Sequence, residues 1–356
     1  MFRGAIGGPI GLVFVLTLSW PATTAGDDLR RFEYTETHMG SPFHIVLYSP
    51  TEAAASRASR AAFQRIAALD ACFSDYQPDS ELSRLSAQSG GPATRVSDDL
   101  FDILLRSRTM ADASAGAFDV TVGPVVRLWR RARRDGKLPE PETLSRARAL
   151  VDYRLLELDP VARTVRLRRK GMKLDLGGIA KGYASDAAVH ALRAGGIDRS
   201  LVAGAGDVVA GGPPPGRDGW TIGIAPLENP GSSPERFLLL RDAAVSTSGD
   251  AERFVEIDGK RYSHIVDPRT GLGVVDRSSV TVVARDGPTA DALATAVYAL
   301  GPDRGLALVD ATQGASALIV RAGAAGRQSL ESRAFSALPK PQSEHARDPS
   351  ARVSPE

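Results

Sequence analysis

The chain has 356 residues, of which 43% are hydrophobic and 24% are charged. This composition is that of a globular protein with one large core or two smaller ones, and it excludes a chain that is disordered throughout. The 44 Lys and Arg residues against 42 Asp and Glu give a formal net charge of +2, and the cations do not form runs with interleaved aromatic residues. We therefore expect no nucleic-acid partner.

The N-terminus has the features of a secretory signal peptide. Arg3 precedes an apolar run from Ile10 to Trp20, and the small residues of a signal-peptidase site follow at 21–25. A membrane anchor would need about 20 continuous apolar residues, and glycines and a proline interrupt the flank of this run. No cysteine follows closely enough for lipidation. We predict that residues 1–25 are removed, that the mature protein starts near Gly26 in the periplasm or is otherwise exported, and that no stable membrane span remains.

Hydrophobic periodicity predicts helices and strands in mixed order. In the first helix the apolar residues Phe63, Ile66, Leu69 and Phe73 recur every three or four positions. Predicted helices cover 54–73, 97–110 with Ser97 as N-cap, 179–193 and 290–300. Predicted strands cover 44–48, 164–168, 200–202, 220–224, 253–257 and 279–283. This order favours an α+β fold with mixed and antiparallel sheets and packed helices over a regular βαβ array.

Two segments differ in composition from the rest. Residues 210–219 contain GGPPPG and predict a surface loop, inserted in the domain rather than linking two domains. Residues 324–356 are rich in Ala, Ser, Arg, Pro and Glu, which predicts a mobile, disordered tail. We therefore expect a single large domain over 26–323.

Cys72 is the only cysteine, so no intramolecular disulfide can form and core packing must hold the fold. Its neighbours Leu69, Ala71 and Phe73 are apolar. This context favours a buried structural thiol over a nucleophile.

A glycine-rich turn is the first candidate for chemistry. Residues 173–184, KLDLGGIAKGYA, pass from a short apolar strand through two glycines into a helix, where Lys181 adds a cation. Free N–H groups at a helix start suit an anionic ligand such as a phosphate. The Gly-Lys-Ser/Thr ending of a Walker motif is missing. An ordinary tight turn would have the same sequence, so this motif alone leaves both interpretations open.

The second candidate is a pair of oxygen ligands. Helical spacing places Asp291 and Thr295 one turn apart on one face. A carboxylate and a hydroxyl suit Mg²⁺, which binds few protein ligands and keeps waters or substrate phosphates. The same residues also fit a helix cap and a hydroxyl bonded to its own helix.

The third candidate is a strand that ends in a polar turn at residues 262–271, YSHIVDPRTG. Of the five histidines, only His264 lies among so many polar, turn-forming residues. A structural or merely exposed histidine is the alternative.

In this order, the three motifs and four further segments resemble the ApbE family, the FAD:protein FMN transferases. The resemblance runs from Met39 to Leu308, with mild departures: AGD at 205–207 replaces the usual GGD, and MGS at 39–41 replaces MGT. The matching segments are 39–41, FSDY and SELSRL within 73–85, GAFDVTVGP at 116–124 followed by Trp129, 174–183, STSGD at 246–250, 263–271 and 290–295.

The resemblance implies an ApbE-like fold and a set of site residues. It implies Mg²⁺ bound by the side chains of Asp291 and Thr295 and the backbone carbonyl of Gly178. The residues that it places in contact with FAD are Met39, Tyr76, Ala117, Phe118, Asp119, Asp175, Lys181, His264 and Ile265.

The implied reaction splits FAD, places FMN on a Thr or Ser hydroxyl of an exported or membrane flavoprotein through a phosphoester bond, and releases AMP. His264 is the candidate general base, or the group that orients the hydroxyl, because an imidazole with a pKa near 6.5 suits proton transfer at neutral pH. Two alternatives stay open: an FAD pyrophosphatase that uses water and yields FMN and AMP, and a flavin-binding protein without metal chemistry.

Overall fold

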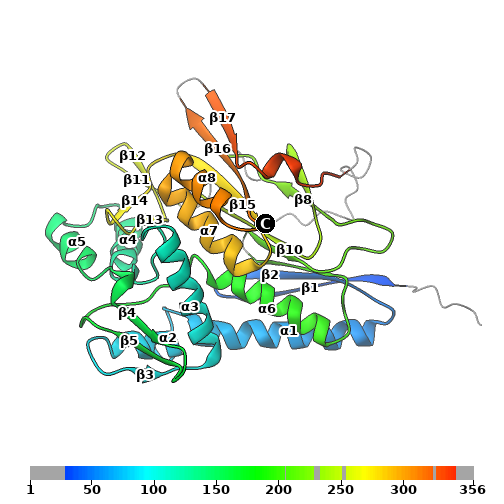
Figure 1. Ribbon diagram of the computed structural model, residues 1–356, viewed down its shortest axis with the longest axis horizontal. Coiled ribbons are helices and arrows are strands. Elements are labelled where there is room, and N and C mark those ends of the chain that lie inside the picture. The colour runs from blue at the N-terminus through cyan, green and yellow to red at the C-terminus, as the bar shows by residue number, and fades with distance from the viewer. Residues whose placement is uncertain (1–28, 205, 228–232, 251–253, 324–325, 342–356) are drawn as a thin grey trace, which may run out of the picture.

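The computed structural model describes residues 29–204, 206–227, 233–250, 254–323 and 326–341 (Figure 1). The predicted signal peptide lies outside the described residues. None of the described helices is both long and apolar enough to cross a membrane. The helices are α1 (Glu52–Phe73), α2 (Glu81–Ala87), α3 (Asp98–Ala113), α4 (Gly123–Asp135), α5 (Pro141–Arg148), α6 (Ala180–Ala194), α7 (Gly287–Leu300) and α8 (Pro302–Ala311), with short 3-10 turns η1 (Tyr153–Leu155) and η2 (Phe335–Ala337).

The centre of the molecule is an antiparallel sheet with strand order β1-β2-β6-β7-β10-β15-β16-β17. Its strands are β1 (Arg30–His38), β2 (Ser41–Ser49), β6 (Ser200–Gly204), β7 (Asp207–Ala210), β10 (Ala243–Gly249), β15 (Ser278–Ala284), β16 (Ser316–Gly323) and β17 (Gly326–Glu331). Smaller sheets contain β3 (Thr94–Arg95), β4 (Leu156–Asp159), β5 (Thr164–Leu167), β8 (Trp220–Ile224), β9 (Arg236–Leu240), β11 (Phe254–Ile257), β12 (Lys260–Ser263), β13 (Val266–Asp267) and β14 (Leu272–Gly273).

The central strands are buried on both faces. In β2, Phe43, Ile45 and Leu47 point into one core cluster and Val46 points into another, as the two-residue period of a strand requires. Two covered faces explain why β6 and β7 are almost entirely apolar rather than alternating.

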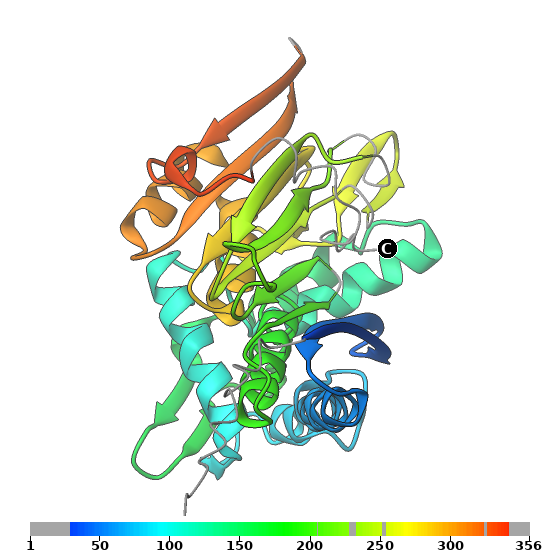
Figure 2. The same ribbon diagram turned by 90° about the vertical axis from the view of Figure 1, so that its right-hand side faces the viewer.

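Different elements cover the two faces. Helices α1 and α6 pack against one face, and Figure 2 shows α1 almost end-on beneath β1 and β2. The β8–β9 hairpin covers the other face, where Trp220 is 1% exposed. Helices α7 and α8 extend the first layer over β15 and β16.

Helices α6 and α7 cross at very close range because both carry glycine at the crossing. A Cβ atom at Gly182 would lie 2.2 Å from the carbonyl oxygen of Gly287, and a Cβ at Gly287 would lie 2.1 Å from the carbonyl oxygen of Gly182. Any side chain at either position would force the helices apart. The crossing holds the glycine-rich turn before α6 against the side chains of α7.

The predicted α+β class is confirmed, and so is each predicted helix and strand within a few residues. Ser97 caps α3 by accepting a hydrogen bond from the backbone N–H of Leu100. The loop predicted at 210–219 is the connection between β7 and β8. Helices α2, α4, α5 and α8 were not predicted.

The predicted tail begins too early. Residues 326–331 form β17, which pairs with β16 from Leu318↔Glu331 to Gly323↔Gly326. Phe335 is only 4% exposed and belongs to the core cluster beneath β8 and β9. An edge strand needs few apolar side chains because its backbone supplies the hydrogen bonds, so composition alone misidentified it. Residues 342–356 lie outside the described part of the chain.

Candidate active site

A cavity of about 480 Å³ opens beside the main sheet and falls in the size range of small-molecule sites. Segments distant in the sequence form its walls: the turn between β1 and β2, the loop after α1, the turn after α3, helix α4, the glycine-rich turn before α6, strands β7 and β10, the β12–β13 connection and α7. Of the predicted site residues, those that line it are Tyr76, Ala117, Phe118, Asp119, Asp175, Gly178, Lys181, His264, Ile265, Asp291 and Thr295.

The oxygen ligands predicted for Mg²⁺ meet at one end of this cavity. Asp291 and Thr295 enter it from α7, and a Cβ at Gly178 would lie 3.0 Å from the Thr295 Oγ1 atom. The Ser248 hydroxyl is 3.4 Å from that same Thr295 oxygen. The Asp291 carboxylate accepts a hydrogen bond from the backbone N–H of Gly182 at 3.1 Å. The close crossing of α6 and α7 therefore positions all three predicted ligands.

This end of the cavity carries an excess of buried negative charge. Asp291 is 3% exposed, and burial together with the neighbouring Asp207 carboxylate raises the pKa of Asp291 to about 7. Burial also raises the pKa of Asp207, and the Lys181 ammonium 3.5 Å away opposes that rise. The Lys181 ammonium interacts with both carboxyl groups and lowers the pKa of each.

These residues fit a hard divalent cation. Their donors are carboxylate, hydroxyl and carbonyl oxygens, which Mg²⁺ prefers, and a bound cation would favour the charged form of Asp291 that burial disfavours. Among the described residues there is no cluster of three or more His, Cys, Asp or Glu side chains. A site with so few protein ligands leaves positions for substrate phosphate oxygens.

A second wall of the cavity is organised by Arg130 of α4. Its guanidinium binds the carboxylate of Asp75 and, at 2.7 Å, that of Asp175. Its Cζ atom also lies over the Tyr76 ring, 4.2 Å from the ring centroid. Tyr76 is 74% exposed, so its ring is available for a flat ligand to stack on. Burial and the Asp75 charge raise the pKa of Asp175, whereas Arg130 lowers it.

The turn that carries Ala117 and Phe118 is anchored by the carboxylate of Asp119. One Asp119 oxygen accepts hydrogen bonds from the backbone N–H and the hydroxyl of Thr121, at 2.8 and 2.7 Å. The other accepts from the backbone N–H of Tyr153 at 2.9 Å. Burial nevertheless raises the pKa of Asp119 to about 6.

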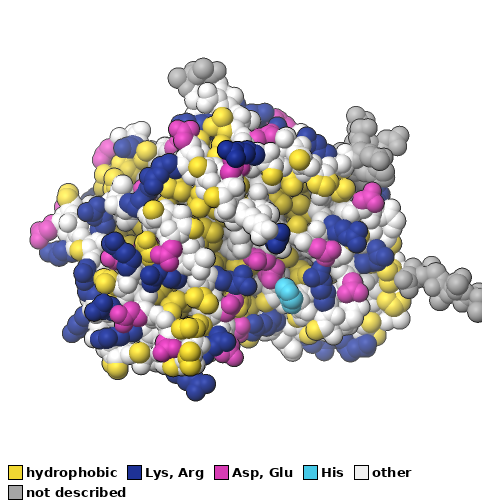
Figure 3. Space-filling model, viewed as in Figure 1, with side chains coloured by type: hydrophobic (Ala, Val, Ile, Leu, Met, Phe, Trp, Pro, Cys, Tyr) yellow, Lys and Arg dark blue, Asp and Glu magenta, His cyan; other side chains and the backbone are white. Residues whose placement is uncertain are grey.

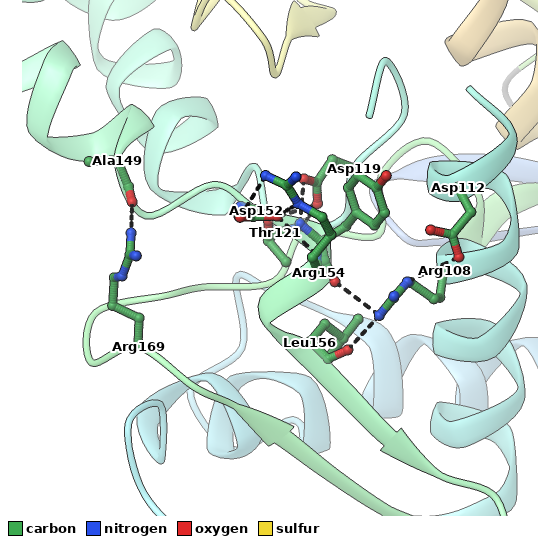
Figure 4. Close-up of polar contacts among 10 residues, drawn as sticks. Arg108, Asp112, Asp119, Thr121, Ala149, Asp152, Arg154, Leu156 and Arg169 are labelled. Carbon is green, nitrogen blue, oxygen red and sulfur yellow. Dashed lines mark hydrogen bonds and ion pairs between the residues drawn. The ribbon is translucent and has the colours of Figure 1, made fainter. Parts of the chain in front are cut away.

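The segment behind this turn is itself tied to α3 (Figure 4). Arg108 donates to the carbonyl oxygens of Tyr153 and Leu156, at 3.4 and 3.0 Å, and Asp152 donates its backbone N–H to Thr121 Oγ1 at 2.9 Å. Both Asp119 oxygens accept hydrogen bonds from Thr121 and Tyr153. The Asp119 side chain therefore supports the cavity wall through these contacts.

The remaining predicted residues differ in how they reach the cavity. His264 and Ile265 line it from the connection between β12 and β13. Met39 does not appear in its lining: its side chain packs against the main core, its φ is +50°, and its backbone N–H donates to Asp70 at 2.8 Å. The following Gly40 lines the wall instead.

Several lining residues were missed by the sequence-based prediction. Asp207 and Arg130 are the most important, and Arg133, Ser246, Thr247 and Thr281 also line the cavity. A carboxylate at the start of the apolar strand GDVVA was a usable signal for Asp207, since a buried charge needs a partner. Arg130 gave no such signal because four other arginines surround it in α4.

The fold and the cavity together define an α+β protein with a cavity that has clustered oxygen donors and a lysine at one end and an arginine and an exposed aromatic ring on its wall. The model of the ApbE family matches residues 39–319. A "FAD:protein FMN transferase" of Treponema pallidum is 34% identical over 307 residues, covering 82% of this chain and 85% of that protein. One of Klebsiella pneumoniae is 31% identical, covering 82% and 90%.

Solved structures agree with these relatives. "Flavin Transferase ApbE from Vibrio cholerae" superposes with a TM-score of 0.79 at 29% identity, covering 87% of this chain and all of that one. The apo flavinyl transferase ApbE of Pseudomonas stutzeri gives a TM-score of 0.77 at 30% identity, covering 87% and 97%. The chain belongs to the ApbE family.

Proposed function

We propose that this protein is a Mg²⁺-dependent FAD:protein FMN transferase that joins FMN through a phosphoester bond to a Thr or Ser of an exported or membrane flavoprotein and releases AMP. One observation carries the proposal. The cavity combines oxygen ligands and a lysine at one end with an exposed aromatic ring and a histidine on its walls. FAD, a dinucleotide, needs charged and oxygen-bearing groups for its diphosphate and an aromatic surface for its flat rings.

The residues divide the binding of FAD between them. Lys181 would neutralise charge on the diphosphate, and Tyr76 would stack on one of the ring systems. Asp291, Thr295 and the carbonyl of Gly178 would hold Mg²⁺, which supplies charge neutralisation at the diphosphate oxygens. Asp119 would hold the backbone of Ala117 and Phe118 in place.

The transfer itself requires an attacking hydroxyl and a departing phosphate. The acceptor Thr or Ser oxygen bonds to the phosphorus on the riboflavin side, the bridging P–O bond breaks, and AMP leaves with the bridging oxygen. His264 takes the hydroxyl proton or orients the hydroxyl for attack. Water in place of the hydroxyl would yield free FMN and AMP, the pyrophosphatase outcome.

The export of the mature chain belongs to the same proposal. Cleavage near Gly26 would bring the enzyme to acceptors outside the cytoplasm. N-terminal sequencing of the secreted form tests this, and an uncleaved chain in the cytosol would contradict it.

Product analysis tests the reaction. The protein is co-expressed with candidate exported flavoproteins, whose covalent flavin is detected by in-gel fluorescence and located by mass spectrometry. We expect an FMN adduct on one hydroxyl residue, lost when that Thr is changed to Val. Release of FMN and AMP with no adduct on any acceptor would replace the transferase by the hydrolase.

Two substitutions separate chemistry from binding. His264→Ala is expected to bind FAD and Mg²⁺ while flavin transfer falls about 10²- to 10⁴-fold, the usual contribution of a general acid–base group. Asp291→Asn is expected to lose Mg²⁺-dependent turnover while the fold survives, because the amide keeps the shape and removes the charge. Unchanged turnover of Asp291→Asn would show that the residue is a structural group of α7.

A further inference from the structure

Helix α4 has three faces with different surroundings. Val125, Trp129 and Ala132 are buried in a core cluster. A second line of residues, Val122, Val126, Arg130 and Arg133, lines the cavity. At 100° per residue, Arg127, Arg131 and Arg134 form a third line that directly adjoins the cavity side. We call these three residues the arginine face, and all three are exposed.

The arginine face carries uncompensated charge. Arg134 pairs with Asp135 at 3.2 Å, but Arg127 and Arg131 have no ion pair within the part of the chain that the structure describes. The exposed Arg133 on the cavity wall has none there either. Partial burial and the nearby charge of Arg127 lower the pKa of Lys173, a sign of crowded cations. On the face of the molecule shown in Figure 3, Lys and Arg side chains lie among Asp and Glu side chains.

The position of this face relative to the reaction site is fixed. Trp129 on the buried side of α4 donates its indole N–H to the carbonyl oxygen of Gly271 at 2.8 Å. Gly271 closes the turn between β13 and β14, the segment that follows His264. His264 and the cavity side of α4 line the same cavity, and the arginine face adjoins that side of the helix.

We propose that the arginine face docks an acidic segment next to the target Thr or Ser of the acceptor protein. The proposal rests on the proposed transferase function. Charge complementarity selects this occupant, because rows of arginine favour carboxylates and speed the encounter of oppositely charged proteins. FAD does not account for the face, because Arg127 and Arg131 lie outside the cavity lining.

A membrane surface fits this helix less well than an acidic peptide. Helices that lie in a lipid interface insert an apolar face beneath their basic face. The apolar face of α4 is already buried in the protein. Only the charged side is presented outward.

The test uses the full-length mature enzyme and a library of peptides, each with one Thr in random flanking sequence, displayed on a folded carrier. After reaction with FAD and Mg²⁺, flavin-bearing members are captured and sequenced. We expect enrichment of Asp and Glu near the modified Thr, and loss of this enrichment with the double variant R127S/R131S. For the best acceptor, KM should rise about three- to tenfold in the double variant, since each exposed charge pair contributes modestly.

Controls separate docking from other effects. The double variant should keep its KM for FAD and its kcat within about twofold. The matched control R57S/R304S removes the same charge from exposed positions on α1 and α8 that have no ion pair among the described residues, and it should keep the acceptor KM. Replacing the acceptor's Asp and Glu by Asn and Gln should abolish the difference between R127S/R131S and the unmodified enzyme.

Three results would overturn the proposal. First, the flavin-labelled peptides could show no enrichment of Asp and Glu. Second, the enrichment could persist in R127S/R131S. Third, the double variant could lose only its binding to phosphatidylglycerol vesicles. The last result would assign the face to a membrane. A library with no labelled member for the unmodified enzyme would instead contradict the transferase function, and the docking site with it.

Discussion

Replacing Arg130 by Gln tests whether one guanidinium holds the cavity wall together. The change removes the cation that pairs with both Asp75 and Asp175, whose side chains are 15% and 9% exposed, and it removes the support under the Tyr76 ring. Removing one partner of a buried ion pair lowers the free energy of unfolding by about 3–5 kcal/mol. Because the Arg130 side chain is 23% exposed, we expect a loss somewhat below this range, roughly 2–3 kcal/mol at pH 8.

The pH dependence distinguishes this mechanism from a simple packing defect. Without Arg130, the pKa of Asp175, already raised by burial and Asp75, should rise further. Protonation then removes the unpaired charge as the pH falls through that pKa. The destabilisation caused by Arg130→Gln should therefore be smaller at pH 5 than at pH 8.

Urea unfolding followed by circular dichroism at both pH values measures the effect. Arg134→Gln on the same helix is the control, and its exposed pair with Asp135 should contribute less than about 1 kcal/mol. Arg130→Lys should recover only part of the loss, because an ammonium cannot bridge two carboxylates and stack on a ring. A loss below about 0.5 kcal/mol at pH 8, or one independent of pH, would refute the reasoning.

Two further substitutions and one labelling experiment probe the interior. Gly182→Ala should destabilise the fold by about 1–3 kcal/mol despite the better helix propensity of alanine, because its Cβ would meet the backbone of Gly287; normal stability in thermal unfolding would contradict the close crossing. Because the pKa of Asp119 is raised in the folded state, its contribution to the free energy of unfolding is complete near pH 4 and is lost as the pH rises through about 6. Asp119→Asn should therefore flatten the dependence of the free energy of unfolding on pH between these values. An unaltered pH profile would contradict the raised pKa. Burial raises the pKa of the Cys72 thiol to about 12, and the thiol donates a hydrogen bond to the Glu81 carboxylate. Cys72 should therefore resist alkylation in the native protein at pH 8 and react in urea; rapid native labelling would show that it is accessible.

Local sequence determined much of the fold. Segments with strong periodicity, such as α1, α3 and α6, were predicted within a few residues, because an amphipathic pattern reflects a single buried face. Helix α4 was not predicted, since arginines occupy five of its thirteen positions and mask the buried line Val125, Trp129 and Ala132. Strand β17 was missed because an edge strand depends on its neighbour rather than on its own side chains.

The same division holds for the site. Sequence alone determined the chemical types: a carboxylate and a hydroxyl one turn apart, a glycine-rich turn with a lysine, and a histidine in a polar turn. Only the tertiary structure decided which groups meet, because a helix crossing that no local pattern encodes brings Gly178 beside Thr295 and Gly182 beside Asp291. Tertiary structure alone also paired Lys181 with Asp207 and placed Arg130 between two carboxylates. Charge interactions depend on distance and burial in space, and neither can be read from the order of residues along a chain.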